Sequence, residues 1–249
     1  MSVRRLAVIA AATVALMAAT RPQPLPVVHL IGDSTMADKP DPDNNPERGW
    51  GQALPALVKP GVRLINYAVN GRSTRSFINE GRWAKVRADL KTGDWLFIQF
   101  GHNDQKVEDS ARYAAPLTAY RRNLERFVQE ARDAGAYPVL FTSIVRRQFN
   151  ASGTLEDTHG MYPLIVRDVA RDLGVPLVDL QWLTEDFVRR AGPVGSIRFY
   201  VHTTEGQFPK FPAARTDNTH LSPLGAAEVA RLAVEEMKRS GGDIGGLFR

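Results

Sequence analysis

LPVVHLIGDST, residues 25–35, decides the fold, because an apolar stretch, Leu25–Ile31, leads directly into Gly32-Asp33-Ser34-Thr35. A continuous run of Val, Leu and Ile is typical of a strand buried on both faces, as in a parallel sheet covered by helices. Four later runs have the same character: Val62–Ala68, Trp95–Phe100, Pro138–Val145 and Val175–Leu180. The sequence therefore predicts five buried strands.

Helical patterns separate these runs. Apolar residues recur at helical spacing behind Pro116, and Gly135 closes that helix. We predict a second helix over His159–Leu173 and a third that starts at Ser222 as its N-cap and ends at Gly241. Strands that alternate with helices indicate βαβ units and right-handed crossovers. The expected fold is one three-layer α/β/α domain.

Two stretches show no regular pattern. Asp38–Arg48 is rich in Asp, Pro and Asn, and Gly192–Thr216 carries Gly, Pro and scattered aromatic residues. Loops of this length in a compact domain are usually functional or disordered. We expect both to be irregular, and the second lies immediately before Asp217.

Composition excludes several classes of protein. The chain of 249 residues has no cysteine, which excludes disulfide frameworks, zinc ribbons and a cysteine nucleophile. Lys and Arg number 32 against 27 Asp and Glu, for a net charge of +5, and no basic block is present. This mild excess argues against a nucleic acid as the main partner.

The first twenty residues have the pattern of a secretory signal. Arg4 and Arg5 precede an uncharged stretch of fourteen residues, 6–19, which is shorter than the roughly 20 residues that cross a bilayer as a helix. We predict that residues 1–20 are a signal peptide and that residues 21–249 form a single domain. The mature protein is then exported, to the periplasm or the medium, without a stable membrane anchor.

Two motifs offer a nucleophile and its base. Ser34 follows the first strand, and a turn from a strand into a helix would present its hydroxyl outside the sheet, where open α/β folds keep their sites. A hydroxyl nucleophile needs an imidazole to take its proton and a carboxylate to orient that imidazole. Asp217 and His220 have the spacing of one turn, so the carboxylate can reach the ring. The alternatives are a helix cap at Ser34 and an Asx turn beside a solvated histidine.

Two further motifs follow the second and third strands. In Asn70-Gly71-Arg72-Ser73 the glycine allows a ligand to approach the backbone closely. In Gly101-His102-Asn103-Asp104 the Asn103 amide can donate to an oxyanion. Either motif alone can also be a tight turn. Because all four motifs fall at the carboxyl ends of predicted strands, we predict one site at that edge of the sheet.

Together the four motifs resemble the four blocks of the SGNH (GDSL-like) hydrolase superfamily. More narrowly, the rhamnogalacturonan acetylesterase family of carbohydrate esterases is similar in the segments GDSTMA, NYAVNGRSTRSF, EGRWAKV, GDWLFIQFGHND and DNTHLSPLGA. The resemblance extends from about Val27 to Met237 and implies a flavodoxin-like sheet of five parallel strands. It also implies a role for five residues: Ser34 as nucleophile and, through its N–H, oxyanion donor, Gly71 and Asn103 as further oxyanion donors, Asp217 as carboxylate and His220 as base.

The resemblance implies a serine esterase that removes O-acetyl groups from a plant cell-wall polysaccharide, above all from rhamnogalacturonan (pectin). Together with the predicted signal peptide, this gives an exported enzyme. Its substrate partner is then an acetylated acidic polysaccharide or oligosaccharide, with no metal or cofactor, and we expect a monomer. Two alternatives stay open. The same chemistry can act on acetylated xylan, another pectin or a lysophospholipid, and a non-catalytic carbohydrate-binding module can use the same cleft.

Several side chains have more than one possible role. Arg72 and Arg75 can pair with uronate carboxylates, which suit a guanidinium, or with backbone carbonyls of the long loops. His102 is interpreted as a structural hydrogen-bonding residue. Trp50 and Trp83 are predicted to lie in the core. The aromatic residues of the second irregular stretch can stack on sugar rings or anchor the loop.

Overall fold

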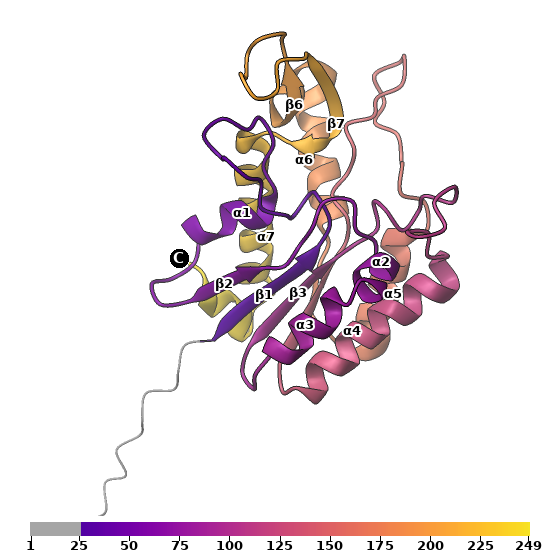
Figure 1. The fold of residues 1–249 in the computed structure, drawn as a ribbon, viewed down its shortest axis with the longest axis vertical. Coiled ribbons are helices and arrows are strands. Elements are labelled where there is room, and N and C mark those ends of the chain that lie inside the picture. The colour runs from indigo at the N-terminus through magenta and orange to yellow at the C-terminus, as the bar shows by residue number, and fades with distance from the viewer. Residues whose placement is uncertain (1–25) are drawn as a thin grey trace, which may run out of the picture.

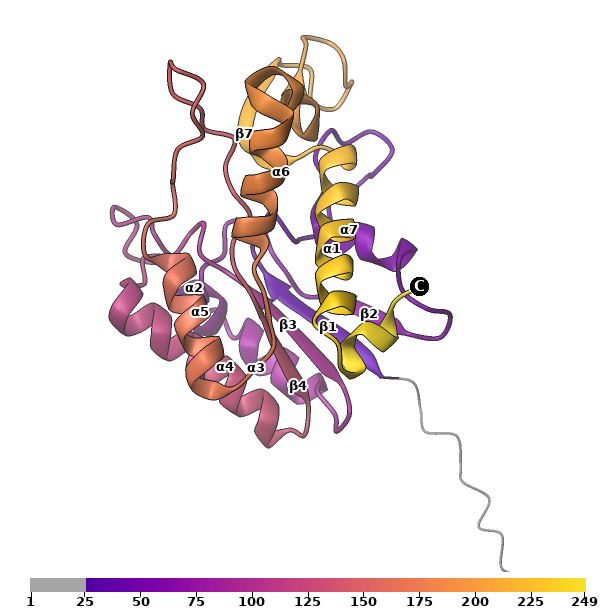
Figure 2. The ribbon, with the colours of Figure 1, turned by 180° about the vertical axis from the view of Figure 1, so that it is seen from behind.

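The computed structural model describes residues 26–249, so the predicted signal peptide, residues 1–20, lies outside the described residues. Five parallel strands form the main sheet in the order β2-β1-β3-β4-β5. Figure 1 labels β2, β1 and β3, and Figure 2 also labels β4. Their bounds are β1 Val27–Gly32, β2 Arg63–Asn66, β3 Trp95–Gln99, β4 Tyr137–Phe141 and β5 Leu177–Val178. Each strand overlaps one predicted run, although β1 and β4 each extend one residue beyond theirs, and the five-stranded parallel sheet confirms the predicted fold class.

Helices cover both faces of the sheet (Figures 1 and 2). One face carries α1 (Trp50–Ala53), α6 (Leu180–Gly195) and α7 (Pro223–Arg239). The other face carries α2 (Thr74–Asn79), α3 (Arg82–Asp89), α4 (Arg121–Asp133) and α5 (Tyr162–Leu173). Within residues 26–249, no helix combines the length and the apolar character needed to cross a bilayer.

The two helical layers pack on alternate residues of the strands. Leu30 and Phe97 lie in the core under α1 and α7, whereas Ile31 and Ile98 lie in the core under α2–α5. All four are fully buried, as a sheet covered on both faces requires. Trp50 and Trp83 are buried as predicted, and each indole N–H donates to a side-chain oxygen, of Gln99 and Glu130 respectively.

The three predicted helices are present. The helix behind Pro116 begins with the π-helical turn Pro116–Tyr120 and continues as α4. The third is α7, and its N-cap Ser222 accepts the N–H of Gly225 at 3.1 Å. The second, α5, begins at Tyr162, later than the predicted His159. The Asp157 side chain accepts the N–H groups of His159 and Gly160, which holds them in a turn outside the helix.

The prediction that Gly192–Thr216 is irregular was wrong over about half of its length. The stretch contains the end of α6, the 3₁₀ turn Ile197–Phe199 and strand β6 (Tyr200–Thr203), which pairs antiparallel with β7 (Arg215–Leu221). Helix α6 was not predicted; Gly192 and Pro193 interrupt its last turn, where Gly192 has a positive φ of 71°. Only the connection between the two strands is irregular, and Asp38–Arg48 is irregular as predicted.

Candidate active site

Ser34 lies in a sharp turn directly after β1. The Asp33 carboxylate accepts both the backbone N–H of Thr35, at 2.9 Å, and its hydroxyl, at 2.8 Å. Asp33 and Thr35 are fully buried, whereas Ser34 lies between them at the surface of the turn with 7% of its area exposed. The buried neighbours therefore fix the turn and leave the Ser34 hydroxyl available to groups outside the sheet.

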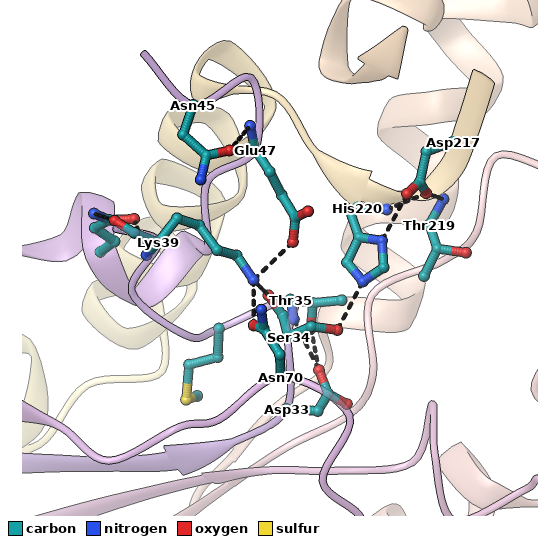
Figure 3. Close-up of polar contacts among 12 residues, drawn as sticks. Asp33, Ser34, Thr35, Lys39, Asn45, Glu47, Asn70, Asp217, Thr219 and His220 are labelled. Atoms are coloured by element: carbon teal, nitrogen blue, oxygen red, sulfur yellow. Dashed lines mark hydrogen bonds and ion pairs between the residues drawn. The ribbon is translucent and has the colours of Figure 1, made fainter. Parts of the chain in front are cut away.

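His220 connects that hydroxyl to Asp217 (Figure 3). Its Nε2 lies 2.8 Å from Ser34 Oγ, and its Nδ1 lies 2.8 Å from Asp217 Oδ2. The other carboxylate oxygen accepts the backbone N–H groups of Thr219 and His220, both at 2.9 Å. The structure thus brings together the three residues predicted as nucleophile, base and carboxylate, in the order that proton transfer from a hydroxyl requires. Their catalytic roles stay predictions.

Asp217 and His220 lie within strand β7, not after the last strand as predicted. The pairing register shifts between Tyr200, which faces Leu221, and Val201, which faces Asp217. Residues 218–220 therefore bulge out of the hairpin, and bulges of this kind re-aim side chains beside active sites. The hairpin stands beyond the carboxyl ends of the main sheet, so the bulge carries the imidazole to Ser34 (Figure 1).

The surroundings of Asp217 keep it ionised. Burial by itself would raise the pKa of this carboxyl, but the hydrogen bonds from the His220 side chain and backbone, followed by that from Thr219, outweigh burial and lower the pKa below its ordinary value. A carboxylate in this state accepts the Nδ1 proton of His220. Nε2 is then the basic nitrogen, and it is the one that faces the hydroxyl.

Two further predicted residues lie on the neighbouring loops. Gly71 has a left-handed φ of 75°, which favours glycine there. Asn103 is buried, and its amide donates to the carbonyl of Arg72 at 3.1 Å, directly beside Gly71. Among the described residues, no protein atom accepts the backbone N–H of Ser34 or of Gly71. Both N–H groups can therefore donate to a bound oxygen atom, as can the second N–H of the Asn103 amide.

The arginines that were ambiguous have protein partners. Arg72 contacts Glu80 at 3.0 Å and donates to the carbonyl of Asn70 at 2.9 Å. Arg75 donates to the carbonyl of Ser110 at 3.3 Å. Both arginines thus donate to backbone carbonyls, as in the second alternative, but these carbonyls lie outside the two long irregular stretches 38–48 and 192–216.

Arg112, which sequence reasoning missed, has its guanidinium beside Gly71. Its Nη1 would be 3.8 Å from a Cβ atom placed on Gly71. Its Nε pairs with Asp109 at 3.0 Å, and 38% of the side chain is exposed. No motif surrounds Arg112, so the sequence carries no signal for it.

His102 has the structural character that was predicted for it. It is buried, and its Nδ1 lies 3.3 Å from Nε2 of His159. Burial, reinforced by nearby positive charge, lowers the pKa of His102 well below its ordinary value and keeps the ring neutral. The aromatic residues Phe199 and Tyr200 are also buried, so they anchor the hairpin in the core. Within residues 26–249, no three His, Asp or Glu side chains cluster as metal ligands do.

Comparisons with known proteins agree with this geometry. The model of the GDSL-like lipase/acylhydrolase family matches residues 30–227. Rhamnogalacturonan acetylesterase RhgT of Bacillus subtilis is 41% identical over 214 residues, which are 86% of this chain and 90% of that protein. The crystal structure of protein YxiM of Bacillus subtilis has a TM-score of 0.72 at 25% identity, over 87% of this chain and 57% of that chain. The crystal structure of acetylxylan esterase Axe2 of Geobacillus stearothermophilus has a TM-score of 0.60 at 20% identity, over 85% of this chain and 93% of that chain. This similarity concerns the fold alone.

Proposed function

Because the chain belongs to the GDSL-like lipase/acylhydrolase family and is a carboxylic ester hydrolase, we propose that it removes acetyl groups from rhamnogalacturonan, an acidic plant cell-wall polysaccharide. The observation that carries the proposal is the hydrogen-bonded row Ser34–His220–Asp217, in a chain that is 41% identical to a rhamnogalacturonan acetylesterase. The comparisons support removal of acetyl groups from polysaccharides in general, and the assignment to rhamnogalacturonan is the more specific part of the proposal.

The geometry suits acyl transfer in two steps. Ser34 Oγ attacks the acetyl carbonyl carbon while His220 Nε2 takes its proton, and Asp217 holds the imidazolium that forms. The carbonyl oxygen becomes an oxyanion, and the N–H groups of Ser34, Gly71 and Asn103 donate to it. The ester C–O bond then breaks, and the sugar oxygen leaves with the proton from His220. Water repeats the sequence on the acetyl-serine, which releases acetate and restores the Ser34 hydroxyl.

Export is part of the proposal. Its support is the sequence pattern of residues 1–20, in which a positive start precedes a short apolar core. An extracellular or periplasmic enzyme can reach a polysaccharide that is too large to enter the cytoplasm.

We expect Asn103→Ala to lower kcat by about 10²–10³, the usual loss for one side-chain oxyanion donor, with little change in KM. Steady-state kinetics on p-nitrophenyl acetate measure both constants, and a thermal melt checks that the lost bond to the Arg72 carbonyl leaves the fold intact. If the whole defect lay in KM, Asn103 would be a substrate-binding residue and its assignment as an oxyanion donor would be wrong.

The substrate class is tested by acetate release from acetylated rhamnogalacturonan, acetylated xylan and p-nitrophenyl acetate at increasing salt. We expect the rate on rhamnogalacturonan to fall, because the Debye length shortens from ~10 Å at 0.1 M to ~3 Å at 1 M and screens contacts with galacturonate. Arg112→Gln should lower kcat/KM about tenfold on this polymer and spare the small ester, since its exposed guanidinium lies beside Gly71.

Arg75→Gln is the matched comparison. Its guanidinium donates to the Ser110 carbonyl in the loop that carries Arg112, so its loss should lower kcat/KM on the polymer by less than the loss of Arg112 itself and spare the small ester. Faster hydrolysis of acetylated xylan than of rhamnogalacturonan would overturn the substrate assignment and leave the ester hydrolase. Polysaccharide binding without hydrolysis of any ester would favour a binding module.

A further inference from the structure

A chain of charged side chains connects the Ser34 turn to Asp217 by a second route. Lys39 Nζ donates to the Ser34 carbonyl at 2.7 Å and contacts Glu47 Oε1 at 2.7 Å (Figure 3). Glu47 Oε2 lies 3.5 Å from Nη2 of Arg215, which donates to Asp217 Oδ2 at 2.9 Å. With the bonds of the imidazole, these contacts close a ring of six residues: Ser34, Lys39, Glu47, Arg215, Asp217 and His220.

The ring is built into the fold. The Lys39 side chain is 2% exposed and that of Glu47 is 13% exposed. A buried charge without a partner is costly, so each of the two constrains the other. Lys39 Nζ also donates to Asn70 Oδ1 at 2.5 Å, which attaches it to the loop after β2. The Arg48 N–H donates to the Leu221 carbonyl at 2.9 Å, which attaches the irregular stretch 38–48 to β7.

Arg215 reaches Asp217 at the oxygen that faces the imidazole. Oδ2 accepts from both Arg215 and His220 Nδ1, while Oδ1 accepts two backbone N–H groups. Four donors fix the orientation of this carboxylate. We propose that Arg215, itself held by the buried Glu47–Lys39 pair, is a positioning residue that fixes Asp217 against the His220 ring. The inference depends on the proposed function in one respect, namely that His220 acts as the base in ester hydrolysis.

The signs of the charges alternate around the ring. Lys39 and Arg215 are positive, Glu47 and Asp217 are negative, and the four charges cancel. An imidazolium at His220 therefore forms next to a neutral set of charges. If Arg215 is neutralised, the set becomes negative and favours the imidazolium, so the base is lost at a higher pH. If Glu47 is neutralised, the set becomes positive and the base is lost at a lower pH.

Two other titratable groups interact with His220. Asp33 follows β1, and its charge interacts with the imidazole. His102 follows β3 and interacts with it as well. Neither residue is changed in the variants below, so both contribute equally to wild type and variant.

The test compares Arg215→Gln, Glu47→Gln and the double variant with wild type in the pH dependence of kcat/KM on p-nitrophenyl acetate. The acid limb of this profile reports protonation of the base in the free enzyme. We expect it to move up by about 0.5–1 pH unit in Arg215→Gln and down by about as much in Glu47→Gln, the scale for neighbouring charges that are largely shielded from solvent but lie near the surface. The double variant should return near wild type.

The same variants separate positioning from substrate binding. Arg215→Gln should lose about tenfold in kcat with little change in KM, the scale of one charge-assisted hydrogen bond. Arg215→Lys keeps the charge and should restore the acid limb. Arg239→Gln is the control, because it removes an exposed partner of Glu236 at the far end of α7 and should change neither constant. A loss confined to KM on polysaccharide, with an unmoved acid limb, would make Arg215 a substrate-binding residue and overturn the proposal.

A second measurement does not depend on activity. A proton NMR titration of the His220 ring in wild type and each variant should show the same opposite shifts of the midpoint. Equal midpoints in all variants would overturn the inference. Failure of the proposed function has other signatures, namely faster hydrolysis of acetylated xylan than of rhamnogalacturonan, or polysaccharide binding without hydrolysis of any ester. If Glu47→Gln proves too unstable in a thermal melt, Arg215→Gln and Arg215→Lys still decide the matter.

Discussion

Replacement of Ser34 by alanine should reduce acetate release by about 10⁶, to the level that remains when a serine nucleophile is removed but the oxyanion donors are kept. The only hydrogen bond of the hydroxyl among the described residues is with His220 Nε2 at 2.8 Å. The lost atom is therefore the one that would form the acetyl-enzyme. Rates on p-nitrophenyl acetate and on acetylated rhamnogalacturonan should fall together, because both share the acyl-transfer step.

Stability should hardly change in this variant. Ser34 is at the surface of its turn, and the turn itself is fixed by the bonds of Asp33 to Thr35, which the substitution leaves in place. We expect the free energy of unfolding to change by about 0.5 kcal/mol or less. Ser240→Ala, the same change at the exposed end of α7, should keep full activity and serves as the control. Activity of Ser34→Ala comparable with wild type would remove Ser34 as the nucleophile.

The main sheet was predictable because its signals are local. A continuous apolar run followed by Gly-Asp-Ser-Thr suits a buried strand and its turn and little else, and β1 has this form. The strand ends were less predictable. Ile144 and Val145 are buried although they lie beyond β4, because packing against the helices, not strand pairing, covers them. An apolar run therefore marks burial, and it overestimates the length of the hydrogen-bonded strand.

The hairpin was not predictable because tertiary contacts hold it. Strand β6 has four residues, too few for a clear alternation. The hairpin is fixed at β6 by the Tyr200 hydroxyl, which donates to the Val145 carbonyl. It is fixed at β7 by Arg147, whose backbone N–H donates to the carbonyl of Asn218 at 2.7 Å. These partners lie 55 and 71 residues apart in the sequence, a separation that no local pattern spans.

The residues of the candidate site also differ in whether local sequence predicts them. Ser34, Asp217 and His220 were predicted because their motifs are short and their spacing has a chemical meaning. Lys39 and Glu47 were not, since isolated charges in an irregular stretch are usually solvated and their burial appears only in the fold. One signal for Arg215 was present. It precedes Asp217 by two residues, and side chains two apart on a strand lie on one face.

His220→Ala should lose as much activity as Ser34→Ala, about 10⁶ in kcat, whereas Asp217→Ala should lose about 10⁴. The imidazole moves the proton in both steps, so nothing replaces it. The carboxylate only orients the ring and stabilises its charge, so part of the rate survives its loss. Single-turnover and steady-state rates on p-nitrophenyl acetate measure the three variants under one set of conditions.

The decisive comparison is the double variant Ser34→Ala/His220→Ala. Residues that act as one unit are strongly non-additive, so the double variant should be no slower than either single variant. Losses that multiplied instead would mean that His220 acts on the substrate independently of the Ser34 hydroxyl, although the two atoms lie 2.8 Å apart. An Asp217→Ala loss as large as that of His220→Ala would show that the ring cannot hold its orientation without the carboxylate, since its remaining hydrogen bond within residues 26–249 is with Ser34 itself.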